Sequence, residues 1–405
     1  MSGFVQSAAV EPDRLSFQAT VTAVDGTAIT LDQTYFFAES GGQPADRGTL
    51  NDIPVTDVQM DAERIRHHVE DEDAFAVGDS VQGEIDPVFR RYCKRAHTAS
   101  HVIYGAARGK LTDLGYGGFE ISEDKVRIDF ASGESIDRQT VLEIERLANE
   151  AVWESRAVTW EEISREDALE SDDIAFNTAT EDIFATTDQV RIVEVDGWDR
   201  AACGGTHLRN TAEIGPIVVL DRSNPGKDLT RVEFAVGPAA INRISAIHGV
   251  AQTAANSLDT TPRELPSAIS TLKEDIASKD DRIESLEREL LQMMVAGFET
   301  IESDSSSWKV GVVPTLTTDD QGQILLEAVD DEPIAVIVAL SGKDRTTITV
   351  ASNGSIPANA IMDHVTDQFG GGGGGSEAVA QGGGIPESPE NLATRIRETI
   401  IPQFS

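Results

Sequence analysis

The chain has 405 residues, of which 40% are hydrophobic, so it has room for about two to four globular domains with real cores. Its 33 lysine and arginine residues stand against 70 aspartate and glutamate residues, which gives a net charge of −37. Because the acid is spread along the whole chain, an acidic tail is excluded. A surface adapted to very high salt is favoured over an acidic protein that avoids nucleic acid.

Residues 1–87 are expected to form a small β-barrel, because several short strands alternate with turn residues. Ser16–Val24 and Ala28–Asp32 flank an Asp-Gly turn, which is a strong hairpin signal. Further strands are expected at Val55–Gln59, Ile65–Val69 and Val81–Asp86. The long polar stretch 36–46 contains two adjacent glycines and is a candidate binding loop.

Residues 88–258 are expected to form an α+β domain that opens with a helix. His97 and His101 stand four residues apart, so a helix places both imidazoles on one face, within reach of one metal ion. About a hundred residues later, Cys203 and His207 enclose two glycines and a threonine. Those glycines are expected to let the backbone turn so that both side chains face one point.

Two readings of these side chains remain open from the residues alone. A histidine pair on a helix is usually coincidence, and Cys203 alone is more often a buried small residue. Taken together, the two pairs predict a zinc site with three imidazoles and one thiolate. The zinc-protease signature is excluded, because Thr98 stands where its glutamate follows the first histidine. Cys93 lies one turn before His97 and is expected to be a packed core thiol rather than a fifth ligand.

A basic stretch coincides with this helix. Between Pro87 and Thr112 the chain carries no acidic residue, although acid is abundant elsewhere. The stretch is either a solvated basic face or a surface left positive for a phosphate backbone. The cations in this stretch are Arg90, Arg91, Lys94, Arg95, Arg108 and Lys110.

Later elements of this domain are read from periodicity and turn signals. A helix is expected at 137–155. Strands are expected at Lys125–Phe130, Gln189–Val195, Ile217–Asp221 and Thr230–Val236. Residues 259–303 then carry a narrow apolar stripe, in which residues recur three and four apart with one lysine among them. The stripe is Ile269, Leu272, Ile276, Lys279, Ile283, Leu286, Leu290 and Met293. It favours a coiled-coil spacer over an ordinary amphipathic helix on a core.

Residues 304–405 are expected to form an α/β domain. Its expected strands and helices are Val310–Val313, Pro333–Leu340, Thr346–Ala351, Ile356–Thr366 and Asn391–Ile400. A run of six glycines from Gly370 lies between the two helices. A flexible linker is less expected inside a domain, so the run is interpreted as a backbone surface that approaches RNA or a partner chain.

The chain has two cysteines, which lie far apart in the sequence, so it has no disulfide framework. Such low cysteine usage is typical of proteins in a reducing cytoplasm. The N-terminus lacks a basic-then-apolar signal, and no apolar run approaches transmembrane length. We therefore expect a cytoplasmic protein with no membrane partner.

Three motifs carry a resemblance to a known family: SGGQ at 40–43, HTASH at 97–101 and CGGTH at 203–207. With the stripe and the glycine-rich tail, they resemble the editing and C-terminal domains of alanyl-tRNA synthetase. The layout is similar to the long form of the freestanding alanyl-tRNA editing proteins. The six-glycine run departs from the family, which usually has a lysine or arginine there, and this weakens phosphate binding by charge.

The resemblance implies a zinc-dependent aminoacyl-tRNA deacylase that removes serine, and also glycine, from mischarged alanine tRNA. It implies that Zn²⁺ is held by His97, His101, Cys203 and His207 and that the hydrolysis takes place at this site. Ligase activity is not expected, because no aminoacylation domain precedes the barrel. A non-catalytic tRNA-binding or dimerising module with a structural zinc, or editing of threonine tRNA, stays open. A homodimer through the stripe and the C-terminal domain is expected.

The resemblance also implies roles for individual residues. By family position, Thr34 and Gln43 are the candidates for reading the substrate's hydroxyl, with turn or cap duty as the alternative. The substrate-binding set is Thr34, Gly41, Gly42 and Gln43. The expected tRNA contacts are Arg90, Arg91, Lys94, Arg95, Gly371, Gly372 and Gly373.

Overall fold

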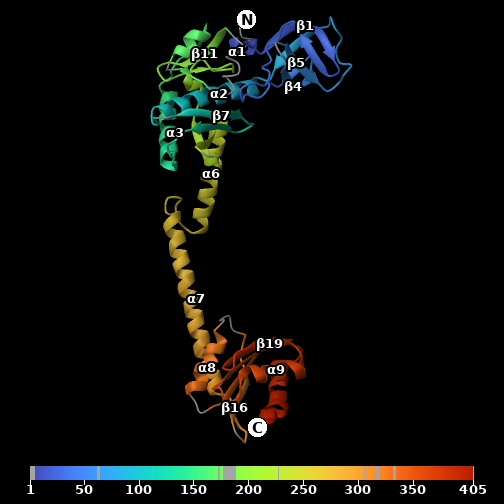
Figure 1. Cartoon of the computed structure of the whole chain (residues 1–405), viewed down its shortest axis with the longest axis vertical. Coiled ribbons are helices and arrows are strands. Elements are labelled where there is room, and N and C mark those ends of the chain that lie inside the picture. The colour runs from blue at the N-terminus through green and yellow to red at the C-terminus, as the bar shows by residue number, and fades with distance from the viewer. Residues whose placement is uncertain are drawn as a thin grey trace. The chain divides into compact units, whose positions relative to one another are not determined.

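The structure is a computed structural model, and it describes residues 5–61, 64–112, 114–171, 174–176, 188–226, 228–304, 306–315, 320–331 and 334–404. They fall into two compact units, Met1–Thr253 and Ala254–Ser405, whose elements are labelled in Figure 1. The expected boundaries after residues 87, 258 and 303 divide the chain more finely and stay predictions. Within the described residues, no helix is long and apolar enough to cross a membrane.

The first unit starts with the short helix α1 (Ser7–Val10) and a closed six-stranded barrel, which confirms the predicted barrel. The strand order around the barrel is β1-β2-β5-β4-β3-β6. Side chains of β1 are buried and exposed in alternation, because one face of each strand lines the core. The strands are β1 (Ser16–Asp25), β2 (Ala28–Leu31), β3 (Gly48–Leu50), β4 (Ile53–Asp61), β5 (Arg64–Val69) and β6 (Ser80–Ile85).

Helix α2 (Pro87–Arg108) follows the barrel directly. The Asp86 carboxylate accepts hydrogen bonds from the backbone N–H groups of Val88 and Phe89, and proline occupies the first turn. Both features favour a helix start at this point. From residue 96 to residue 107 the helix is buried in the largest core of the unit, so its two histidines lie inside the domain.

Two four-stranded sheets complete the first unit, with strand orders β13-β14-β8-β7 and β10-β12-β11-β9. Together with α2 they support the predicted α+β class. Their strands are β7 (Gly115–Ile121), β8 (Val126–Ala131), β9 (Val158–Ser164), β10 (Ile174–Ala175), β11 (Gln189–Val195), β12 (Asp199–Ala202), β13 (Ile217–Gly226) and β14 (Leu229–Val236). The helices are α3 (Arg138–Trp153), α4 (Arg165–Glu170), the 3-10 turn η1 (Thr211–Ile214) and α6 (Gly237–Ser257), the last of which runs into the second unit.

The second unit contains a six-stranded mixed sheet of order β15-β16-β17-β18-β20-β19, in which only β16 and β17 among the described pairs are parallel. Its strands are β15 (Thr300–Glu302), β16 (Ser307–Val312), β17 (Val336–Gly342), β18 (Thr346–Ser352), β19 (Gly372–Gly375) and β20 (Val379–Ile385). Its helices are α7 (Leu265–Ala296), α8 (Gln321–Asp331), α9 (Ala358–Phe369), α10 (Pro389–Arg395), η2 (Ile396–Ile400) and η3 (Ile401–Phe404). The glycine run is thus an edge strand, not a linker.

The stripe expected to form a coiled coil lies on one long helix, α7. Its apolar side chains from Ile269 to Met293 are 42–75% exposed, while Leu291 and Val295 near the end of the helix are buried against α8 and the sheet. A coiled-coil partner for the exposed stripe stays a prediction.

Candidate metal centre

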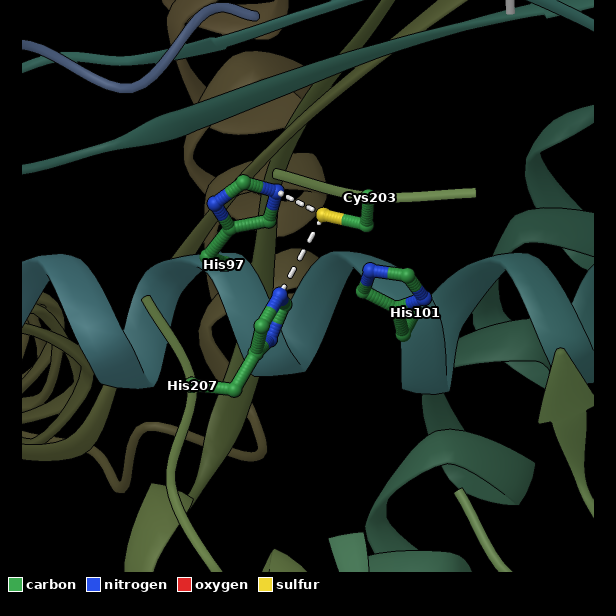
Figure 2. A group of neighbouring side chains, drawn as sticks. All are labelled: His97, His101, Cys203 and His207. Atoms are coloured by element: carbon green, nitrogen blue, oxygen red, sulfur yellow. Dashed lines mark hydrogen bonds between the residues drawn. The ribbon is translucent and has the colours of Figure 1, made fainter. Parts of the chain in front are cut away.

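The four predicted metal ligands converge on one point (Figure 2). His97 and His101 project from neighbouring turns of α2, and Cys203 and His207 come from the loop after β12. Their ligand atoms all lie within 4.8 Å of one another. Cys203 Sγ is 3.2 Å from Nε2 of His97 and 3.2 Å from Nε2 of His207. Three imidazoles and a thiol so arranged can hold one metal ion.

Each imidazole is oriented by a second side chain on its Nδ1 side. Nδ1 of His97 lies 2.9 Å from Gln43 Oε1, and Nδ1 of His101 lies 2.8 Å from a carboxylate oxygen of Asp199. Nδ1 of His207 lies 3.4 Å from the Thr98 hydroxyl. Such partners fix the ring so that Nε2 points at the metal position, which is the usual arrangement around metal-bound histidines.

The electrostatics of the cluster suit a metal ligand set. Burial opposes ionisation of the Cys203 thiol, but the neighbouring His97 and His207 imidazoles outweigh it and hold the pKa of Cys203 well below its usual value. Burial lowers the pKa of His207 to about 3, so that ring is neutral. Burial also opposes protonation of His101, yet its hydrogen bond to Asp199 raises the pKa of His101 to about 10. A bound metal would displace that proton, because only a neutral imidazole is a ligand.

Of the two glycines of the CGGTH loop, Gly205 acts by leaving space for His97, which differs from the expectation that both permit a tight turn. Neither has a positive φ angle. A Cβ added to Gly205 would lie 2.1 Å from Cε1 of His97, whereas one added to Gly204 would meet open space. Any side chain at position 205 would therefore push His97 out of the cluster.

A cavity of about 220 Å³ opens beside the ligands. His97, His101 and Cys203 form part of its wall. Its polar lining is Ser40, Ser100, Tyr104, Tyr116 and Asp199, and Phe119 and Phe176 contribute aromatic surface. Burial raises the pKa of Tyr116 well above its usual value, so this phenol is a neutral hydrogen-bonding group at any physiological pH. A small polar substituent could enter next to the metal position.

Comparisons with known proteins match three parts of the chain. Residues 190–233, which include Cys203 and His207, match the threonyl and alanyl tRNA synthetase second additional domain. Residues 5–88 match the class II (A) tRNA synthetases, and residues 306–401 match the DHHA1 domain.

Whole relatives match along nearly the entire chain. The alanine–tRNA ligase of Pyrococcus abyssi is 33% identical over 380 residues, which are 92% of this chain and 41% of that ligase. The ligase of Natronomonas pharaonis is 34% identical over 391 residues, with the same two shares. The chain resembles the C-terminal part of alanyl-tRNA synthetases.

This chain spans about two fifths of the length of these synthetases. The crystal structure of the C-Ala domain from Aquifex aeolicus alanyl-tRNA synthetase matches 26% of this chain at 20% identity. Its TM-score of 0.23 is too low to bear on the fold.

The SGGQ loop of this synthetase-like chain reaches the metal centre from the barrel. Ser40 and Gly41 line the cavity. Gly42 has φ +84°, and a Cβ there would lie 2.1 Å from the backbone oxygen of Phe119, so the loop and β7 can approach this closely only with glycine. Gln43 is fully buried and contacts His97 and Thr206.

Thr34 does not line the cavity beside the metal ligands. Its hydroxyl lies 2.8 Å from Nε2 of His67 and accepts a hydrogen bond from the backbone N–H of Phe36. The structure thus brings Gln43 to the metal centre as a partner of His97, and leaves Thr34 bonded within the barrel.

The expected basic face needs a correction. Arg90 is 1% exposed, forms an ion pair with Asp46 and donates to the carbonyl oxygens of Pro12 and Tyr35. Lys94 is buried as well and is paired with Asp13. Both cations instead join the barrel and the N-terminal segment to α2, so neither is placed to contact RNA.

The other two predicted cations of the synthetase-like chain remain at the surface. Arg91 is exposed, and the half-buried Arg95 donates from Nε to the carbonyl oxygen of Glu213. Gly372 and Gly373 lie on the edge strand β19 of the second unit's sheet, and Gly371 directly precedes that strand.

Sequence reasoning missed three residues of the site. Asp199 and Thr98 orient metal ligands, and Arg191 donates to the carbonyl oxygens of Cys203 and Gly205. Asp199 lies only four residues before Cys203, so its position was the one available signal. The contact of Arg191 with the loop follows from strand pairing between β11 and β12, which no local spacing reveals.

Proposed function

We propose that this chain hydrolyses the ester bond of mischarged alanine tRNA, with serine as the principal amino acid removed and glycine as a second. The observation that supports this most is the His₃Cys cluster beside a small polar cavity, in a chain similar to alanyl-tRNA synthetases along 92% of its length. The match of residues 190–233 to a domain of the threonyl and alanyl synthetases agrees with the same chemistry.

Zinc fits the donor set. Nitrogen and sulfur ligands bind zinc at roughly 2.0–2.3 Å, which places tetrahedral neighbours about 3.5 Å apart. The 3.2 Å separations of Cys203 Sγ from two imidazoles are close to that value. A zinc ion here would supply Lewis-acid polarisation of an oxygen or would hold the substrate's amino group.

The protein's own groups would provide binding and selection. The cavity lining offers hydroxyl groups of Ser100 and Tyr116 and the Asp199 carboxylate to the aminoacyl end. A polar site discriminates well against an analogue that lacks a hydroxyl, because its buried polar groups are then left unpaired. Seryl and alanyl esters differ by one hydroxyl, so such a lining suits this task.

The deciding experiment is deacylation of purified, separately charged tRNAs by the full chain. We expect hydrolysis of seryl-tRNA(Ala), slower hydrolysis of alanyl-tRNA(Ala), and little hydrolysis of seryl-tRNA(Thr). Cys203→Ser and zinc removal by a chelator should each abolish the activity. Cys93 is a buried cysteine outside the cluster, so Cys93→Ser should retain the activity. A zinc-loaded chain that binds tRNA and hydrolyses none of these esters would instead be a non-catalytic tRNA-binding module.

The second unit is proposed to capture tRNA and to join two chains. The support is its match to the DHHA1 domain and the exposed apolar stripe on α7, which a second copy could cover. Removal of residues 259–405 should raise KM more than it lowers kcat, because only uniform binding is lost. Light scattering of both forms should report a dimer for the full chain only.

The acidic composition is proposed to reflect adaptation to high salt. These assays therefore belong in molar potassium chloride. Contacts to phosphate are weak there, and shape and stacking carry more of the RNA affinity.

A further inference from the structure

A second cavity, of about 310 Å³, lies in the first unit apart from the one beside the metal ligands. The two cavities have no lining residue in common. The second is bounded by the end of α1, by β9 and β11, and by the loop that carries His207. Its volume is at the lower end of the roughly 300–1,000 Å³ range of small-molecule sites.

The wall of the cavity carries the indole ring of Trp160, which is not packed into a hydrophobic core of the described residues. Trp160 lies on β9, which is an edge strand, and its side chain is 40% exposed. It pairs across the strands with Val193, which also lines the cavity. An exposed indole at the rim of a hollow offers a flat face for stacking, which is how proteins bind unpaired bases of any sequence.

A buried guanidinium lies against the same cavity. Arg191 is 5% exposed and its carbon Cζ lies 5.2 Å from the centre of the Trp160 ring. Its terminal nitrogens donate to the carbonyl oxygens of Cys203, Gly205 and Ala9. Its Nε, however, has no hydrogen-bond partner within the described residues. A buried donor without a partner is unfavourable, so a ligand acceptor that reached this nitrogen would be stabilised by pairing with it.

A second cation stands at the rim. The side chain of Arg209 is 78% exposed, and its Nε lies 3.0 Å from Oδ2 of Asp13. The other carboxylate oxygen of Asp13 pairs with Lys94. An exposed ion pair such as that of Arg209 with Asp13 contributes little to stability, so a phosphate can compete for the arginine. Two arginines beside one indole are unexpected in a chain of net charge −37.

We propose that this cavity binds one unpaired nucleotide of RNA, with its base on Trp160 and its phosphate at Arg209. The inference rests on the proposed function, which makes a tRNA the substrate. The single-stranded 3′ end is the part of a tRNA whose bases are free to stack. Arg191 joins the cavity to the backbone of Cys203 and Gly205, and His207 lies in the cavity wall, so a nucleotide bound here would lie against the loop of the candidate metal ligands.

Binding of uncharged tRNA(Ala) to the full chain tests the proposal without catalysis. Trp160→Ala should raise the Kd roughly 5- to 100-fold, the range seen when one stacked base loses its aromatic partner. Trp160→Phe should recover most of the affinity. Trp153→Ala is the matched control, because Trp153 is 74% exposed at the end of α3 and lines neither cavity. Arg209→Ala should raise the Kd and reduce its dependence on salt.

Equal Kd values for Trp160→Ala and Trp153→Ala would overturn the proposal, and so would the absence of RNA binding by the unaltered chain. Deacylation of seryl-tRNA(Ala), measured in parallel, separates this outcome from failure of the proposed function. If the chain hydrolyses seryl-tRNA(Ala) and Trp160→Ala binds tRNA with an unchanged Kd, the proposed function stands and the proposed nucleotide site is wrong. If Trp160→Ala raises the Kd for tRNA but the unaltered chain hydrolyses no ester, the proposed nucleotide site stands and the proposed function is wrong.

Discussion

Gln43 in the barrel loop and His97 on α2 are joined by a 2.9 Å contact between Oε1 and Nδ1. The same Gln43 oxygen accepts from the backbone N–H of Thr206, and its Nε2 donates to the Thr206 hydroxyl. These contacts assign the oxygen and the nitrogen of the Gln43 amide. The oxygen therefore accepts the Nδ1–H of His97, and the Nε2 atom of His97 faces Cys203 without a proton. The barrel thereby fixes the orientation of a candidate metal ligand on α2.

Gln43→Leu is expected to weaken metal binding by roughly 10- to 100-fold, the usual effect of losing a residue that orients a metal-bound histidine. Leucine has a similar volume but offers no acceptor to His97 Nδ1 or to the Thr206 N–H. Competition with a chromogenic chelator measures the affinity. Gln33→Leu is the control, since that exposed side chain donates only to the Gln18 carbonyl oxygen within the barrel. An unchanged affinity in Gln43→Leu would show that the contact does not orient the ligand.

This contact marks the limit of what the sequence could predict. The pair at 97 and 101 follows from local geometry, since residues four apart share a helix face. The pair at 203 and 207 lies within one short loop, so its members are close in the chain. The roles of Gln43 and Arg90 depend on how the barrel docks on α2, and no local period carries that information. A basic run on a helix looks the same whether its cations face solvent or an internal carboxylate such as Asp46.

The strands show the same distinction. The hairpin around Gly26 and the buried strand β11 were predictable, because a turn dipeptide and an apolar run mark them. The three-residue strand β3 was missed, as was β7, which contains three glycines. β3 is held between β4 and β6, and β7 is held at the sheet edge by β8, so strand pairing overrides weak local preference.

Thr34→Val is expected to destabilise the barrel by about 1–3 kcal/mol while zinc content is kept. The change removes the hydroxyl that contacts the buried ring of His67, and an unpaired buried group carries that penalty. Chemical unfolding reports the stability. Thr56→Val is the control, because Thr56 is exposed on β4 and its hydroxyl donates to the His68 carbonyl oxygen.

The same variant tests the role that the resemblance implies for Thr34. Hydrolysis of seryl-tRNA(Ala) and alanyl-tRNA(Ala) is measured side by side. If Thr34 reads the substrate's hydroxyl, their ratio falls in Thr34→Val and not in Thr56→Val. If the ratio is unchanged while the barrel loses stability, Thr34 acts only in stabilising the barrel through its contact with His67.

Barrel stability is expected to fall as the pH drops from about 6.5 to about 4. Burial lowers the pKa of His67 from 6.5 to about 4, so the unfolded chain takes up a proton in this range before the folded chain does. The stabilisation is complete above pH 6.5 and is lost as the pH approaches 4. Its size is about 3 kcal/mol, from 1.36 kcal/mol per pKa unit.

Calorimetry of the full chain at several pH values measures this effect. His67→Gln keeps a donor and an acceptor near Ile29 and Thr34 but cannot titrate, so its melting temperature should fall less steeply with acid than that of the unaltered chain. His68→Gln, at the next and more exposed position of β5, should change the slope less, because the charge of His68 is only the smallest of the causes that act on His67. Parallel slopes for all three proteins would exclude His67 as the group responsible.

The glycine strand β19 offers a test of the proposed RNA surface in the second unit. A Cβ at Gly374 would meet nothing within 4 Å, whereas one at Gly373 would lie 2.7 Å from the carbonyl oxygen of Gln381 and 2.9 Å from the sulfur of Met362. Gly374→Glu should therefore fold normally, and Gly373→Glu should destabilise the sheet. The exposed position 374 places a negative charge on the edge strand without a steric cost.

If this edge faces tRNA, Gly374→Glu should lower the affinity roughly fivefold, which corresponds to about 1 kcal/mol for one charge near another in water. The loss should shrink as salt is raised, because screening shortens the reach of the charge. Gly133→Glu adds the same charge in open space in the loop before α3 of the first unit, and serves as the control for net charge. Equal tRNA affinities for the two variants at low salt would mean that the glycine strand does not contact RNA, and its edge would then be free to pair with another protein chain.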